Sequence, residues 1–76
     1  LRLGRPAEAL EHETAIAAIH GVTADGAAVA AAACLDLGRR EEAGEWLARG
    51  LRLDPDNQRL LTLHARWADE TAPDND

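Results

Sequence analysis

The feature that most constrains the fold is an internal repetition at the start of the chain. The segment LRLGRPAEALE, residues 1–11, returns as LDLGRREEAGE, residues 35–45, at an offset of 34 residues. The matching residues are Leu1, Leu3, Gly4, Arg5, Glu8, Ala9 and Glu11, which align with Leu35, Leu37, Gly38, Arg39, Glu42, Ala43 and Glu45. A period of this length predicts a repeat architecture in which neighbouring units stack, because no single unit can bury its own apolar face.

Glycine and proline divide the first half of the chain into two predicted helices. The first spans residues 6–20, since Pro6 suits the first helical position and Gly21 suits a left-handed helix end. The second follows Thr23 or Asp25 as the N-cap and runs to about Leu37, before Gly38.

Two further helices are predicted in the second half. The third spans residues 40–53, and Asp54 is expected to cap a fourth helix that has Pro55 in its first turn and reaches about Asp69. Residues 70–76 are expected to form a disordered acidic tail. The chain is rich in Ala and Leu and poor in aromatic and β-branched residues, so the predicted fold class is all-α, with four helices in antiparallel succession.

Apolar periodicity predicts which helix faces are buried. In the third helix the stripe comprises Ala43, Trp46, Leu47, Gly50 and Leu51; in the fourth it comprises Leu60, Leu61, His64, Ala65 and Ala68. The pattern is weaker in the first helix, where Glu13 falls on the face that should be buried. Trp46 and Trp67 are interpreted as packing residues rather than partner contacts, because the chain has no other large aromatic side chain.

Charge and composition argue against several functional classes. The net charge is −6, and eight Arg are dispersed among fourteen acidic residues, so no basic face for nucleic acid is expected. The Ala run around Cys34 is too short to span a membrane, and a single Cys allows no intrachain disulfide. We therefore expect a cytoplasmic protein without membrane or nucleic-acid partners. The absence of an initiator Met suggests a piece of a longer chain.

The repeat can be given a register. If a unit starts at Ala24, then Gly38 falls in the inter-helix turn, Ala43 at a small position and Leu47 at a large apolar one, and the unit ends in LRLDPDN. In these features the chain resembles the tetratricopeptide repeat (TPR) family. The resemblance implies an α-solenoid of helix hairpins, with residues 24–57 as one complete repeat. Residues 1–23 would then be the second helix of a partial repeat, and residues 58–69 the first helix of a third repeat or a capping helix.

The sequence departs from the TPR pattern at several core positions. Ala27 stands where the family usually has a large residue, Cys34 where it has Tyr, and Gly50 where it has Ala. We therefore expect a thin core.

The resemblance also implies a protein-binding function. First helices of successive TPR units line a concave groove that holds an extended peptide or a partner helix. The groove positions here are Asp25, Ala28, Val29, Ala32, Asp36, Arg59, Thr62, Leu63 and Arg66. The residues that hold a ligand's terminal carboxylate in some TPR proteins are missing from residues 24–37, so that specificity is not expected. Arg59 and Arg66 either donate to an acidic ligand or pair with Asp25 and Asp36 across the groove.

The alternative is a small regulatory, metabolite-binding or enzymatic helical domain that uses Cys34 or a histidine. Cys34 lies in an apolar helical run without a group to orient a base, and is interpreted as a buried thiol. The spacing of His12, His20 and His64 is too irregular for a zinc site. The sequence therefore predicts no catalytic residue, no metal site and no cofactor.

The ends of a short solenoid are expected to be open. Leu10 and Ile16 in the first helix, and Leu60, Leu61 and Trp67 in the fourth, are expected to lack intrachain cover. Self-association is therefore predicted, with a closed two-fold homodimer preferred to end-to-end stacking because the net charge of −6 opposes open-ended growth.

Overall fold

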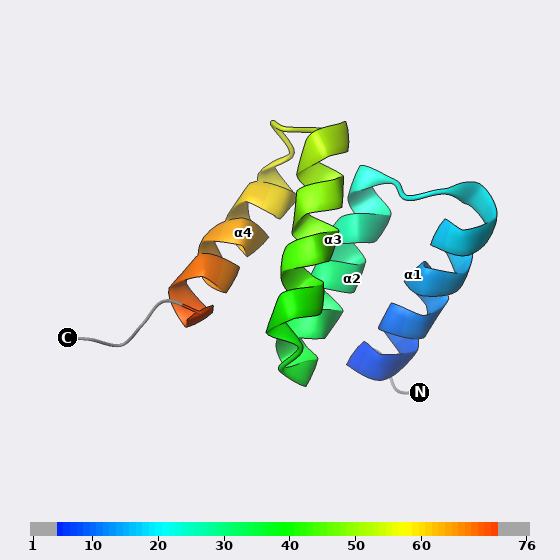
Figure 1. Cartoon of the computed structure of the whole chain (residues 1–76), viewed down its shortest axis with the longest axis horizontal. Helices are drawn as coiled ribbons and strands as arrows, with labels where there is room; N and C mark the ends of the chain where they lie inside the picture. Colours follow the sequence, from blue (N-terminus) through cyan, green and yellow to red (C-terminus); the bar gives the residue numbers. More distant parts are fainter. Residues whose placement is uncertain (1–4, 72–76) are drawn as a thin grey trace.

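The computed structural model describes residues 5–71 as four α-helices. These are α1 (Pro6–His20), α2 (Ala24–Leu37), α3 (Arg40–Leu53) and α4 (Gln58–Thr71), and no strand occurs in the described part of the chain. Successive helices run in opposite directions (Figure 1). The predicted all-α class and antiparallel succession are therefore confirmed.

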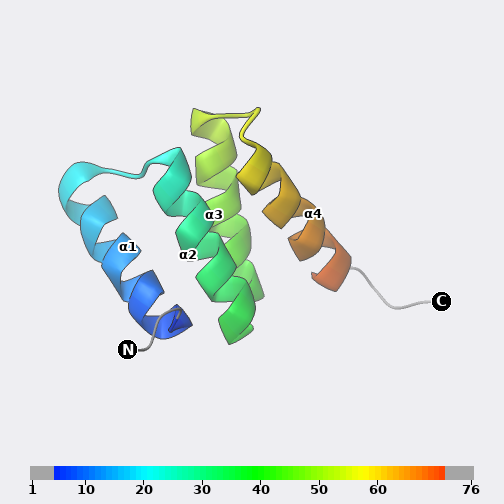
Figure 2. The same cartoon turned by 180° about the vertical axis from the view of Figure 1, so that it is seen from behind.

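The second helix lies at the centre of the arrangement. α2 packs on α1, α3 and α4, whereas α1 has no close backbone approach to α3 or α4 within residues 5–71. Seen from behind, α1 and α4 lie on opposite flanks of the central pair (Figure 2). No described helix is long and apolar enough to cross a membrane.

Local turn chemistry sets the ends of the first two helices as predicted. The Thr23 hydroxyl accepts a hydrogen bond from the Gly26 backbone N–H at 2.9 Å, which caps α2. At the other end Gly38 is left-handed (φ 79°), and the next residue, Arg39, donates its N–H to the Cys34 carbonyl at 2.8 Å. A glycine is favoured at this φ because it has no Cβ to clash.

The predicted start of the fourth helix was wrong. Asp54 and Pro55 lie in a turn, and Asn57 caps α4 instead: its side-chain oxygen accepts from the Leu60 N–H at 3.0 Å. The turn is closed by the Asn57 N–H donating to the Asp54 carbonyl at 3.1 Å. An Asn is as good an N-cap as an Asp, so the helix begins three residues later than proline alone suggests. The repeat register, which placed a helix start at residue 58, agrees with this boundary.

The end of α4 also differs from the prediction. α4 continues to Thr71, so residues 70 and 71, which were predicted to begin a disordered tail, are helical. The rest of that predicted tail lies outside the described residues.

The core is built from small side chains on α2 and a few large ones on its neighbours. Five alanines of α2 are buried together with Cys34 and Leu35, and the largest fully buried side chains are Leu47, Leu60 and Cys34. At Gly50 an added Cβ would lie 2.8 Å from a Leu60 methyl carbon and 2.9 Å from the Ala27 Cβ. α2, α3 and α4 therefore meet at a point where only glycine fits.

The predicted buried stripe is right for α3 and wrong for α4. Ala43, Trp46, Leu47 and Gly50 are buried and Leu51 is half-buried. In α4, Leu60, Leu63 and Trp67 face the core instead, while Leu61, His64, Ala65 and Ala68 are exposed. The cause lies on α3, since Leu60 fits at Gly50 and the Trp67 ring lies against Gly44. The Trp67 indole N–H also donates to the Arg40 carbonyl at 2.9 Å.

Candidate functional site

The largest hollow in the described part of the molecule lies over α2, between α4 and the start of α1. Its volume is about 690 Å³. α2 contributes Ala28, Val29, Ala32, Ala33 and Asp36; α4 contributes Gln58, Arg59, Thr62 and Leu63; α1 contributes Pro6 and Ala9. Most of these side chains are apolar, and the charged ones are Asp36 and Arg59.

The sequence of α2 explains why a hollow forms there. Ala28 and Ala32 are one helical turn apart, so they lie on the same face of the helix. Their side chains end at Cβ and leave the surface of α2 low, whereas Leu63 of α4 stands beside them as a larger wall. The result is an open apolar trough along α2.

The groove residues predicted from the sequence fall into two groups. Seven of the nine line this hollow: Ala28, Val29, Ala32, Asp36, Arg59, Thr62 and Leu63. Asp25 and Arg66 are not part of its lining. The sequence reasoning missed Ala33, Gln58, Pro6 and Ala9. Gln58 could have been found as the neighbour of Arg59, but the two α1 residues belong to the hollow only because of how α1 packs on α2.

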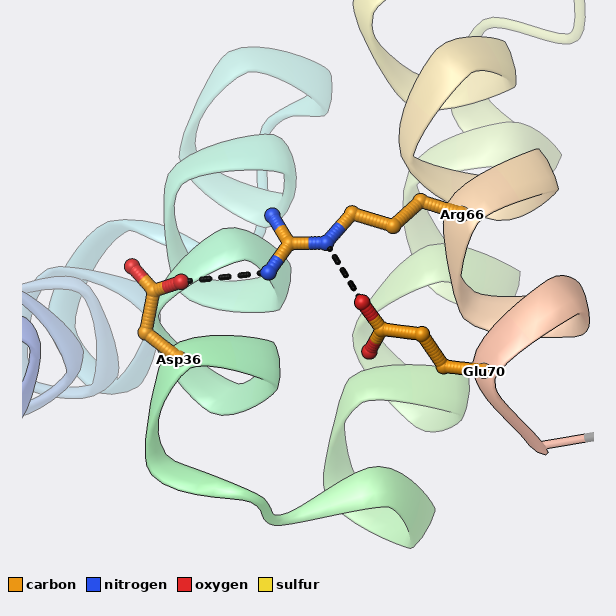
Figure 3. A network of polar contacts seen from close by, with 3 residues as sticks. All are labelled: Asp36, Arg66 and Glu70. Carbon is orange, nitrogen blue, oxygen red and sulfur yellow. Dashed lines mark hydrogen bonds and ion pairs between the residues drawn. The ribbon is translucent and has the colours of Figure 1, made fainter.

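Arg66 is held in a network with two carboxylates (Figure 3). Its Nη2 donates to Asp36 Oδ1 at 3.2 Å and its Nε donates to Glu70 Oε2 at 3.0 Å. The hydrogen bond to Glu70, followed by that to Asp36, raises the pKa of Arg66 above its ordinary value. The Arg66–Asp36 pair joins α4 to α2, whereas the other described ion pairs join residues three or four apart.

Arg59 differs from Arg66 in having no partner within residues 5–71. It is exposed, lines the hollow, and makes no hydrogen bond or ion pair with another described residue. Of the two pairings expected across the groove, Arg66 with Asp36 is present, and Arg59 with Asp25 is not. The hollow therefore has one guanidinium available to a ligand and one carboxylate that is already neutralised by Arg66.

Cys34 and the histidines do not form a reactive arrangement in residues 5–71. Cys34 is fully buried, and burial, followed by the nearby Glu42 carboxylate, raises the pKa of its thiol to about 11. A thiol with such a pKa stays protonated at neutral pH and is a poor nucleophile. His12, His20 and His64 are exposed, and no group of three metal-ligating side chains occurs among the described residues.

The residues expected to be open at the two ends are placed differently from one another. Leu10 is only 6% exposed and Leu60 is fully buried, so both have intrachain cover, contrary to expectation. Ile16 and Trp67 are half-buried, and Leu61 is 41% exposed. Leu10 and Leu60 are covered because α1 and α4 each turn their larger residues toward α2 and α3.

In comparisons with known proteins, no family model, no curated protein sequence and no solved structure matches this chain significantly. The fold and the geometry of the hollow therefore carry the functional argument.

Proposed function

We propose that this chain is a non-catalytic, TPR-like scaffold that binds a peptide segment or helix of a partner protein in the hollow over α2. The observation that carries the proposal is an apolar trough of about 690 Å³ with one guanidinium, that of Arg59, unpaired within the described residues. Ligand sites combine apolar area with a few placed polar groups in this way.

The repeat register supports the same proposal. It placed a helix start at residue 58 and assigned seven of the residues that line the hollow. On this register residues 24–57 are one complete unit, residues 1–23 belong to a preceding unit and residues 58–69 to a following one.

The charges favour a particular kind of ligand. An apolar side chain would occupy the trough between Ala32 and Leu63, and a carboxylate near it would receive hydrogen bonds from Arg59. Arg66 is not expected to be the main donor, because Asp36 and Glu70 already hold its guanidinium.

Selection from a random peptide library displayed on phage tests this function. We expect selected peptides to combine large apolar residues with an acidic residue. Ala32→Trp should abolish their binding by filling the trough, and Arg59→Ala should weaken it about fivefold to tenfold, as expected for one exposed charge-assisted contact. The matched control is Arg52→Ala, which removes an exposed arginine of α3 outside the lining.

Two results would refute the proposal. One is a library selection that yields no binding peptide. The other is a set of selected peptides that bind the Ala32→Trp variant as tightly as the parent protein, since these would bind elsewhere.

A further inference from the structure

The outward face of α4 is a second surface with an organised pattern. Leu61, His64, Ala65 and Ala68 are all exposed and follow the spacing i, i+3, i+4, i+7, so they form one stripe along the helix. We call this stripe the outer face of α4. It lies on the opposite side of α4 from Arg59 and Leu63, which line the hollow. Within the described chain α4 packs only on α2 and α3.

The charges at the two ends of α4 are the reverse of what a helix favours. Its first turn has no acidic residue and carries Arg59, while its last turn has no basic residue and carries Asp69 and Glu70. The helix macrodipole favours acids at the N-terminus and bases at the C-terminus. α3 follows that preference, with Glu41 and Glu42 in its first turn and Arg52 in its last.

An antiparallel copy of α4 would satisfy both ends at once. The acids at the C-terminal end of one helix would lie beside the N-terminal end and Arg59 of the other, and the reverse holds at the opposite end. A parallel copy would instead bring the acidic ends together. The charge pattern therefore selects an antiparallel second copy as the occupant of this face.

We propose that two copies of this chain associate through the outer faces of α4, packed antiparallel about a two-fold axis that passes between His64 and Ala65. In this register Leu61 of one copy lies opposite Ala68 of the other, so a large side chain meets a small one. Ala65, next to the axis, allows the two helices to approach closely. The contact is self-complementary and closes at two copies.

The dimer is expected to be weak. One helix of 14 residues provides a contact at the low end of interface sizes, where association is transient. The contact does not involve the hollow, so it stands or falls independently of the proposed peptide binding.

Sedimentation velocity across a concentration series up to about 1 mM tests the association. We expect the parent mass to rise toward twice the monomer mass and stop there. Leu61→Glu should remain monomeric while keeping its far-UV circular dichroism. Ile19→Glu is the matched control, because Ile19 is an aliphatic residue of α1 that is 74% exposed. It should behave as the parent does.

Disulfide cross-linking tests the two-fold register. Under mild oxidation Ala65→Cys should give a covalent dimer, because residues 65 of the two copies lie next to the axis, within the short reach of a disulfide. Ile19→Cys should cross-link much more slowly. Cys34 is fully buried and does not interfere.

Three results would overturn the proposal. They are a parent protein that stays monomeric throughout the series, a Leu61→Glu variant that dimerises as the parent does, and equal cross-linking of the two cysteine variants. A mass that grows beyond two copies would likewise show an open-ended contact instead.

Discussion

The two ends of α4 dock on α3 through the same device at different depths. Near its start, Leu60 is fully buried against Gly50. Two turns further on, the half-buried Trp67 lies over Gly44, where an added Cβ would be 2.8 Å from the Trp67 Cζ2. At Gly50 the close neighbours include the Cβ of Ala27, which is bonded directly to the backbone of α2, whereas at Gly44 they are all atoms of one indole ring. The first contact cannot adjust easily, and the second can.

The largest effect is expected at the deep contact. Leu60→Ala should lower the free energy of unfolding by about 2–4 kcal/mol, because it empties a site whose neighbours, Ala27 and Gly50, are too small to fill it. Leu47→Ala, at another fully buried leucine, should have an effect of similar size. Urea denaturation followed by far-UV circular dichroism measures both. A loss below about 1 kcal/mol for Leu60→Ala would show that the cavity collapses and that the contact is not rigid.

A smaller loss is expected when the glycine of the deep contact is filled. Gly50→Ala should destabilise by about 1–2 kcal/mol, because the new methyl group would overlap Leu60 and the Ala27 Cβ. The gain in helix propensity, up to about 1 kcal/mol, offsets only part of the cost of overpacking. The same denaturation measurement applies, and a stabilised Gly50→Ala protein would contradict the close approach of the three helices.

The smallest effect is expected at the shallow contact. Gly44→Ala should change the free energy of unfolding by no more than about 0.5 kcal/mol, because the Trp67 ring can shift at the surface and the helix gains propensity. The emission of Trp67 should change nonetheless, which can be measured by fluorescence in a Trp46→Phe background. If Gly44→Ala proved as costly as Gly50→Ala, the two ends of α4 would be equally rigid and the comparison would fail.

The candidate site shows the same division between local and tertiary information. The repeat register was sufficient to assign Val29, Ala32 and Thr62 to the hollow, because register fixes which residues of a helix share a face. It could not separate Arg59 from Arg66. Asp36 lies 30 residues before Arg66, and the pair forms only because α4 packs beside α2.

The sequence by itself determined the all-α class and the bounds of α1, α2 and α3, because helix ends depend on residues within one turn, such as Pro6, Thr23 and Gly38. Only the tertiary structure decided which face of α4 turns inward. Leu61 and Leu60 are equally apolar, and the choice between them rests on the Gly44 and Gly50 notches in α3. Packing compares whole surfaces of two helices, so it depends on residues far apart in the sequence, whereas capping depends on near neighbours.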